Sequence, residues 1–166
     1  IDLGDARVVR SVLAGVPLDA VTLTELVAAL TAKDGSTVQA LARQCPPETR
    51  AGLATLLEMY GGDEVLEQAR HRLPARAPIA AALDDLAWLA RHLRQSNPDV
   101  RIGFDLSDMS GYAYYSGVRF AVYGAGSTNA LVRGGRYDEV GAVFGRNRPA
   151  VGCSLDLKGL TAVTPI

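Results

Sequence analysis

The chain has 166 residues, the size of a single domain with a sizeable core. Its 17 basic and 18 acidic residues nearly balance, whereas a nucleic-acid-binding protein is expected to carry a net basic face. No apolar run approaches the roughly 20 residues of a membrane-spanning helix, and we expect no signal peptide. Cys45 and Cys153 lack the spacing of metal ligands. We therefore expect a cytoplasmic protein with reduced thiols, no metal or other cofactor, and neither membrane nor nucleic acid among its partners.

The first part of the sequence predicts helices. After a strand end over residues 1–4, apolar residues recur at helical spacing, and Gly and Pro separate the segments. Helices are expected over residues 5–13, 22–34, 36–44, 48–60, 63–73 and 79–95, with a linker at 74–78. Thr22 and Glu25 have the spacing of a capping box, so the second helix is expected to begin at Thr22 and to end before Gly35. The clearest apolar stripe lies on the last helix and consists of Leu83, Leu86, Leu89, Ala90 and Leu93.

From residue 99 onward the pattern changes to the alternation typical of strands. Strands are expected over residues 100–104, 114–123, 127–133 and 150–155, with a polar turn at 105–110 and a loop at 124–126. The second and third strands would form an antiparallel hairpin. The fourth is small and apolar, which predicts a buried strand, and a helix with Leu157 and Leu160 facing inward is expected from Asp156. The fold class is therefore α+β, with a helical segment over residues 22–97 and an antiparallel sheet portion over residues 99–166.

A polar segment lies between the third and fourth of these strands. Residues 134–138 read Gly-Gly-Arg-Tyr-Asp, and the glycine pair permits close approach to the backbone. A basic loop over residues 145–149 then leads into the last strand. Composition and spacing alone favour a hairpin and a core strand with solvated charges. The other interpretation is a ligand pocket, in which polar side chains converge on an apolar floor.

These motifs resemble those of a known family. Residues 134–138 and 149–152 resemble the histidine-pocket segment and the third motif of histidyl-tRNA synthetases, and residues 111–118 resemble the tyrosine-containing segment of the same enzymes. Three further segments resemble the synthetase paralogue that serves as regulatory subunit of ATP phosphoribosyltransferase, namely 105–108, 144–149 and 154–158. The resemblance covers nearly the whole chain, and its motifs follow the order of the family.

This resemblance implies the antiparallel sheet of a class II aminoacyl-tRNA synthetase, interrupted by a helical segment. Family members are much longer and carry two further motifs upstream, so residues 1–166 are expected to be a fragment of one such domain. The resemblance implies a non-catalytic subunit that assembles with the short-form catalytic subunit of ATP phosphoribosyltransferase, as a homodimer within a hetero-oligomer. L-Histidine would be the effector, giving feedback on the first step of histidine biosynthesis.

The resemblance also assigns a histidine-binding site. Tyr115 and Tyr137 match tyrosines that line the histidine pocket, and a phenol can both donate to and accept from an imidazole. Gly135 and Gly152 would let the ligand approach the backbone. Tyr114 is expected on the opposite face of its strand, in the core.

Arg136 and Asp138 are expected to brace the loop beside this pocket through a charge-assisted pair, rather than to touch the ligand.

No catalytic residue is expected. In the synthetases an arginine meets the charge that develops on the α-phosphate, and the matching position in this chain is Ser110. Ala113 stands where the same motif has an aspartate, and Gly159 stands where the third motif has an arginine. Two other interpretations are a fragment of an active histidyl-tRNA synthetase and a synthetase-like scaffold that has lost its ligand. The missing cations argue against the active synthetase.

Overall fold

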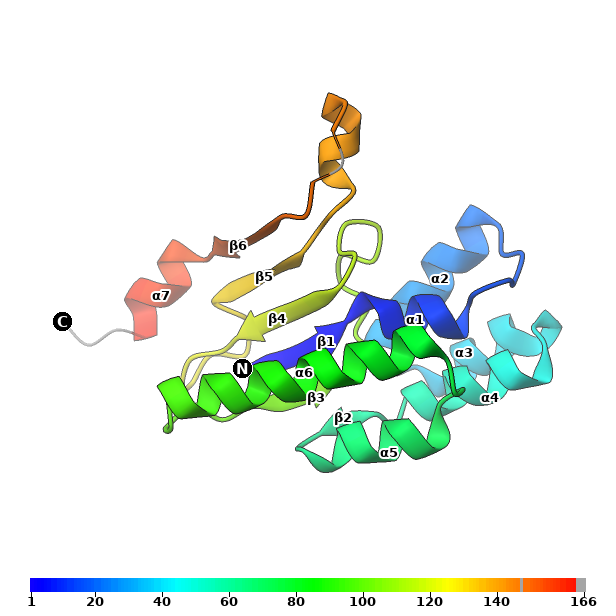
Figure 1. Cartoon of the computed structure of the whole chain (residues 1–166), viewed down its shortest axis with the longest axis horizontal. Helices are drawn as coiled ribbons and strands as arrows, with labels where there is room; N and C mark the ends of the chain where they lie inside the picture. The colour runs from blue at the N-terminus through cyan, green and yellow to red at the C-terminus, as the bar shows by residue number, and fades with distance from the viewer. Residues whose placement is uncertain (147, 164–166) are drawn as a thin grey trace.

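The computed structural model describes residues 1–146 and 148–163, so Asn147 of the predicted basic loop lies outside the described residues. The described residues form one mixed sheet with helices on one side and at one end (Figure 1). The strands are β1 (Asp2–Asp5), β2 (Tyr60–Gly61), β3 (Gly103–Asp105), β4 (Val118–Val122), β5 (Val132–Arg136) and β6 (Val151–Leu155). The helices are α1 (Ala6–Val12), α2 (Ala20–Thr31), α3 (Gly35–Leu41), α4 (Pro47–Leu56), α5 (Glu64–Arg72), α6 (Ala77–Ser96) and α7 (Leu157–Val163), with 3₁₀ turns η1 (Ala42–Gln44) and η2 (Val140–Phe144).

The strand order is β2-β3-β1-β4-β5-β6, and β1 lies inside the sheet. Strands β4, β5 and β6 form the expected antiparallel sheet, and β1 pairs antiparallel with β4 through Leu3 and Phe120. On its other edge β1 pairs with β3 in parallel, which the expectation of an antiparallel sheet did not include. The parallel pair is feasible because the helices between β1 and β3 provide the long crossover that such a pair requires.

Helix α6 runs across one face of this sheet (Figure 1). Leu86 and Leu83 of α6 are almost fully buried, and they share one core cluster with Leu3 of β1 and Phe104 of β3. The stripe predicted from the sequence therefore faces the sheet. We call this side, which carries Leu3 and Phe120, the helix face. An apolar groove of about 390 Å³ lies on it, lined in part by Leu89, Leu93 and Phe120.

Several predicted helix boundaries are wrong. Helix α2 begins at Ala20 because Asp19 caps it: the Asp19 carboxylate accepts hydrogen bonds from the backbone N–H groups of Val21 and Thr22, at 2.9 Å each. Gly35 begins α3 instead of ending the previous helix, because Asp34 is the N-cap of α3. The fourth predicted helix stops at Leu56, and Tyr60 belongs to β2. Helix α6 already begins at Ala77, inside the predicted linker.

The strand predictions also needed correction. Residues 114–117 lie in a turn and bend that precede β4. Of the first predicted strand, 100–104, only residues 103 and 104 belong to a strand, β3, which continues to Asp105. The third predicted strand, 127–133, is shifted along the chain, because β5 covers Val132–Arg136. Strand β6 begins one residue later than predicted and is not buried: Val151 is 79% exposed, because β6 is the last strand of the sheet among the described residues. Leu157 of α7 was expected to face inward and is 70% exposed, whereas Leu160 is half-buried. Within the described ranges, no helix is long and apolar enough to cross a membrane.

The first prediction concerns the core. We expect Leu86→Ala to destabilise the protein by about 2–5 kcal/mol, because it removes buried methyl groups between α6 and the sheet and leaves a cavity. The same change at the exposed Leu157 should alter the free energy of unfolding by less than about 0.5 kcal/mol. Urea denaturation of both variants measures the difference. Equal costs at the two positions would contradict the outward orientation of Leu157.

Candidate ligand site on the sheet

A row of four residues crosses the sheet on the face opposite the helix face. Gly4 of β1 pairs with Arg119 of β4, Arg119 pairs with Gly135 of β5, and Gly135 pairs with Gly152 of β6. Directly opposed residues of neighbouring strands project to the same face, so all four positions share it. Three of them lack a side chain. We call this side the tyrosine face, because the space above the glycines is occupied by aromatic rings.

Tyr115 and Tyr137 lie on two of these glycines. A Cβ atom at Gly135 would stand 2.9 Å from Cδ1 of Tyr115, and a Cβ atom at Gly152 would collide with the Tyr137 hydroxyl. Since Gly135 and Gly152 are directly opposed, the two rings lie on the same face of the sheet, above neighbouring strands. Both tyrosines are half-buried. The sheet therefore brings together all four residues assigned to the ligand site.

Tyr114 joins this cluster, contrary to the expectation that it lies in the core. Its side chain is 45% exposed, and its ring centroid lies 4.6 Å from that of Tyr137 and 5.3 Å from that of Tyr115. The expectation failed because residues 111–115 form a turn, in which the backbone N–H groups of Tyr114 and Tyr115 both donate to the carbonyl of Gly111. Gly111 has a φ of 75°, which disfavours other residues. Desolvation and a hydrogen bond with Tyr137 raise the pKa of the Tyr114 phenol above its ordinary value.

Ser116, Arg136 and Asp138 tie the end of this turn to β5. The backbone N–H of Ser116 donates to the carbonyl of Arg136 at 2.9 Å, and its hydroxyl accepts from the backbone N–H of Asp138 at 3.0 Å. Nε of Arg136 donates to both carboxylate oxygens of Asp138, at 3.0 and 2.9 Å. Arg136 neighbours Gly135 along β5, so its side chain leaves the sheet on the helix face, away from the tyrosine rings.

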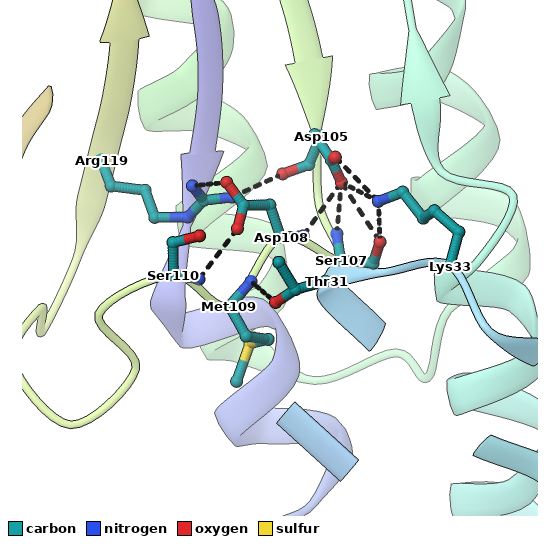
Figure 2. A network of polar contacts seen from close by, with 8 residues as sticks. All are labelled: Thr31, Lys33, Asp105, Ser107, Asp108, Met109, Ser110 and Arg119. Atoms are coloured by element: carbon teal, nitrogen blue, oxygen red, sulfur yellow. Dashed lines mark hydrogen bonds and ion pairs between the residues drawn. The ribbon is translucent and has the colours of Figure 1, made fainter. Parts of the chain in front are cut away.

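Figure 2 shows a partly buried polar network, which the sequence reasoning did not identify. The Arg119 guanidinium binds the Asp108 carboxylate and donates to the carbonyl of Asp105 at 3.2 Å. It reaches them by crossing Gly4, where a Cβ atom would stand 2.7 Å from Nη2 of Arg119. Lys33, which has a positive φ of 57°, binds the Asp105 carboxylate at 2.6 Å. The signal available in the sequence was the pair of aspartates in the predicted polar turn at 105–110.

Two charges of this network, on Asp108 and Arg119, compensate each other. Burial alone would raise the pKa of Asp108, but the Arg119 cation and hydrogen bonds with Ser110 outweigh it and lower that pKa below its usual value. Arg119 is only 7% exposed and is neutralised by Asp108. Ser110, where the resemblance placed a phosphate-binding arginine, donates its backbone N–H to Asp108. Among the described residues, no group of three or more acidic, histidine or cysteine side chains could hold a metal ion.

A smaller feature borders Tyr137 on the side of the basic loop. A cavity of about 340 Å³ is lined there by Tyr137, Val140, Gly141, Arg146, Arg148 and Ala150. Gly135 and Gly152 were expected to let a ligand approach the backbone, but the side chains of Tyr115 and Tyr137 cover them. The site therefore presents three phenols with two arginines nearby. Such a set suits recognition of a small polar molecule by hydrogen bonds, whereas the buried charges beside it are already paired.

Comparison with known proteins identifies the family. A family model described as histidyl-tRNA synthetase matches residues 1–160. The chain belongs to this family. It is 53% identical, over 165 residues, to the ATP phosphoribosyltransferase regulatory subunit of Variovorax paradoxus (strain S110), in a match that covers 99% of this chain and 42% of the relative. The chain thus spans about two fifths of the length of the curated relatives it matches.

Solved structures show the same fold. The ATP phosphoribosyltransferase regulatory subunit/histidyl-tRNA synthetase from Bacillus halodurans C matches with a TM-score of 0.80 and 24% identity, over 99% of this chain and 44% of that chain. The ATP phosphoribosyl transferase (HisG:HisZ) complex from Thermotoga maritima matches with a TM-score of 0.66 and 17% identity, over 93% of this chain and 52% of that chain. These likenesses confirm the α+β, synthetase-like fold.

The second prediction tests the contact between Tyr137 and Gly152. We expect Gly152→Ala to cost about 1–3 kcal/mol, because the new methyl group displaces the Tyr137 hydroxyl. In a Tyr137→Phe background most of that cost should disappear, since the nearest remaining ring carbon is 3.4 Å from the methyl position. Gly135→Ala is the control: its methyl group meets the backbone carbonyl of Val118 at 2.6 Å, which Tyr137→Phe cannot relieve. Thermal unfolding of the variants measures the coupling, and simple additivity at Gly152 would contradict the contact.

The third prediction concerns acid stability. Because the folded-state pKa of Asp108 is lowered, its contribution to stability is present above its unfolded pKa of about 3.9 and is lost as the pH falls through the folded value. Asp108→Asn should lower the free energy of unfolding at pH 7 by about 3 kcal/mol, by leaving the buried Arg119 without its carboxylate. The variant should also lose less stability than the parent between pH 5 and the acid range.

Asp84→Asn, which removes an exposed ion pair with Arg70, is the control and should change stability little. Urea denaturation across the pH range is the measurement. An unchanged acid profile for Asp108→Asn would show that Asp108 and Arg119 are not coupled.

Proposed function

We propose that this chain belongs to a non-catalytic regulatory subunit of ATP phosphoribosyltransferase, which acts in the first step of histidine biosynthesis. The observation that carries the proposal is the 53% identity to such a subunit over 99% of the chain. The partner is the short-form catalytic subunit, and the regulatory subunit forms a homodimer within the hetero-oligomer. A relative of the same fold comes from a complex titled HisG:HisZ, which supports assembly with a catalytic partner. The proposal places the protein in the cytoplasm, with the enzyme it regulates.

We further propose that L-histidine is the effector and binds at the tyrosine face. Tyr115 and Tyr137 supply phenols on one face of the sheet, above Gly135 and Gly152, whose lack of side chains leaves room for the two tyrosines. Tyr114 adds a third, exposed phenol to the same cluster. Phenols can both donate to and accept from an imidazole, whose two ring nitrogens need one partner of each kind when neutral. The ion pair of Arg136 and Asp138 braces the adjoining loop from the other face.

The distribution of charge supports the proposal that the subunit is not catalytic. Forming an aminoacyl adenylate develops negative charge on phosphate, and losing one stabilising donor typically costs a factor of about 10²–10³ in rate. Ser110 and Gly159 replace two arginines of the synthetase pattern, and the buried Arg119 is already neutralised by Asp108. A subunit that binds histidine without transforming it acts through coupling. That coupling requires histidine to bind two states of the complex with different affinity, typically by a factor of about 5–150.

The fourth prediction concerns reconstitution of the complex from the catalytic subunit and the protein as its gene encodes it. Adding it to the short catalytic subunit should raise phosphoribosyltransferase activity, and histidine should reverse the increase. Tyr137→Phe should preserve the increase but weaken inhibition by histidine, because it removes one phenol from the site without emptying the space of the ring. Sedimentation of the mixture provides an independent measure of assembly.

Two controls separate the competing functions. Histidine-dependent exchange between ATP and pyrophosphate should stay at background. Exchange above background would establish a synthetase and overturn the non-catalytic assignment. Assembly and activation without any effect or binding of histidine would instead identify a scaffold that has lost its ligand.

A further inference from the structure

Helix α1 reaches into the turn that carries the tyrosines. Nη2 of Arg10 donates to the carbonyl of Tyr112 at 2.8 Å and to the carbonyl of Tyr115 at 2.9 Å. One nitrogen therefore closes the turn from both ends. The guanidinium carbon also lies 5.2 Å from the centroid of the Tyr112 ring, within the range of a cation–π contact. Among the described residues, Arg10 is the side chain that binds the carbonyls of this turn.

The other side of α1 is anchored. Val8, Val9 and Val12 are fully buried in the core, so the helix that presents Arg10 has a defined position. Nε of Arg10 is buried and has no hydrogen-bond partner in the described part of the chain. A buried donor without a partner lowers stability. Arg10 thus holds the turn through Nη2 while its Nε has no partner among the described residues.

Other contacts also hold the turn: the backbone N–H of Tyr112 donates to the carbonyl of Met109 at 2.8 Å, and Tyr112 packs against the core. The start of the turn is tied to Asp108, and its end is tied to β5 through Ser116. Between these points, Gly111 has a positive φ, which glycine adopts readily and other residues do not. Its carbonyl accepts two hydrogen bonds within the turn. The direction of the Tyr114 and Tyr115 rings depends on that backbone. Fixing it before the ligand arrives lowers the entropy cost of binding.

We propose that Arg10 is a positioning residue of the ligand site. It touches no ligand itself and acts by holding the carbonyls of Tyr112 and Tyr115, which sets the orientation of the Tyr114 and Tyr115 rings. This role rests on the proposed binding of histidine at the tyrosine face. It also places the helix α1, which Arg7 ties to α6 through Asp85 at 2.7 Å, in direct contact with the site.

The fifth prediction compares three variants of the protein as its gene encodes it. Arg10→Met keeps most of the length of the side chain but has no donor, and it should weaken histidine binding about tenfold in calorimetry. Arg10→Lys should recover part of this loss, because both bonds come from a single nitrogen that an ammonium group can imitate. Arg7→Met is the matched control on the same helix. It removes ion pairs to Asp5 and Asp85 and should lower the melting temperature while leaving histidine affinity unchanged.

A second measurement tests the role of Arg10 without relying on the identity of the ligand. Hydrogen exchange at the backbone amides of Tyr114 and Tyr115 should be faster in Arg10→Met than in Arg7→Met. If the parent protein binds histidine and Arg10→Met binds it equally well, the positioning role is overturned and the proposed function stands. If the parent binds no histidine, the proposed effector is overturned, and unchanged exchange in Arg10→Met would then overturn the hold of Arg10 on the turn as well.

Discussion

The structure depends on one row of residues across the sheet, Gly4, Arg119, Gly135 and Gly152. Three positions without side chains leave a flat strip of backbone on the tyrosine face. At one end the Arg119 guanidinium crosses Gly4 to reach Asp108, and at the other the rings of Tyr115 and Tyr137 lie on the remaining glycines. A Cβ atom at any of the three glycines would meet a backbone oxygen, the guanidinium or a tyrosine side chain at less than 3 Å. The register of four strands thus determines both the polar network and the aromatic cluster.

The two faces of the sheet divide the work of the fold. The helix face carries Leu3 and Phe120 toward α6, and this packing supplies the apolar burial that stabilises the domain. The tyrosine face carries the polar network and the three phenols. Strand β1 lies between β3 and β4. It therefore contributes Leu3 to the core beneath the helices and Gly4 to the tyrosine face. Helix α1 continues directly from β1, with Asp5 as its cap, and so Arg10 is presented to the tyrosine turn.

The two cations of the polar network are already compensated. Lys33 and Arg119 are each paired with a carboxylate, of Asp105 and Asp108 respectively. A paired cation contributes little to stabilising new negative charge, because the carboxylate already compensates it. What stays open to solvent is the edge of the aromatic cluster at Tyr114 and the basic loop at Arg148. This arrangement agrees with a site that senses a small molecule and with a neighbouring protein that performs the chemistry.

The sequence by itself determined the α+β class, the long helix α6, the β4–β5 hairpin and the family, since these depend on local periodicity and on short motifs. It also singled out Tyr115, Tyr137, Gly135 and Gly152. The start of α2 was placed wrongly because the sequence offers two possible N-caps, Asp19 and Thr22. In the structure Asp19 is the cap, and its carboxylate accepts from the backbone N–H groups of Val21 and Thr22. Residues 114–117 were taken for the start of a strand, because alternating aromatic and small residues also satisfy a strand pattern.

Only the tertiary structure decided the rest. The parallel pairing of β1 with β3, the inclusion of Tyr114 in the cluster and the contacts of Arg119 and Arg10 all join residues distant in sequence. No local sequence pattern predicts the register between strands, or which carboxylate a long cationic side chain pairs with. Those depend on which backbone atoms the packed helices and the glycine row bring within hydrogen-bond distance.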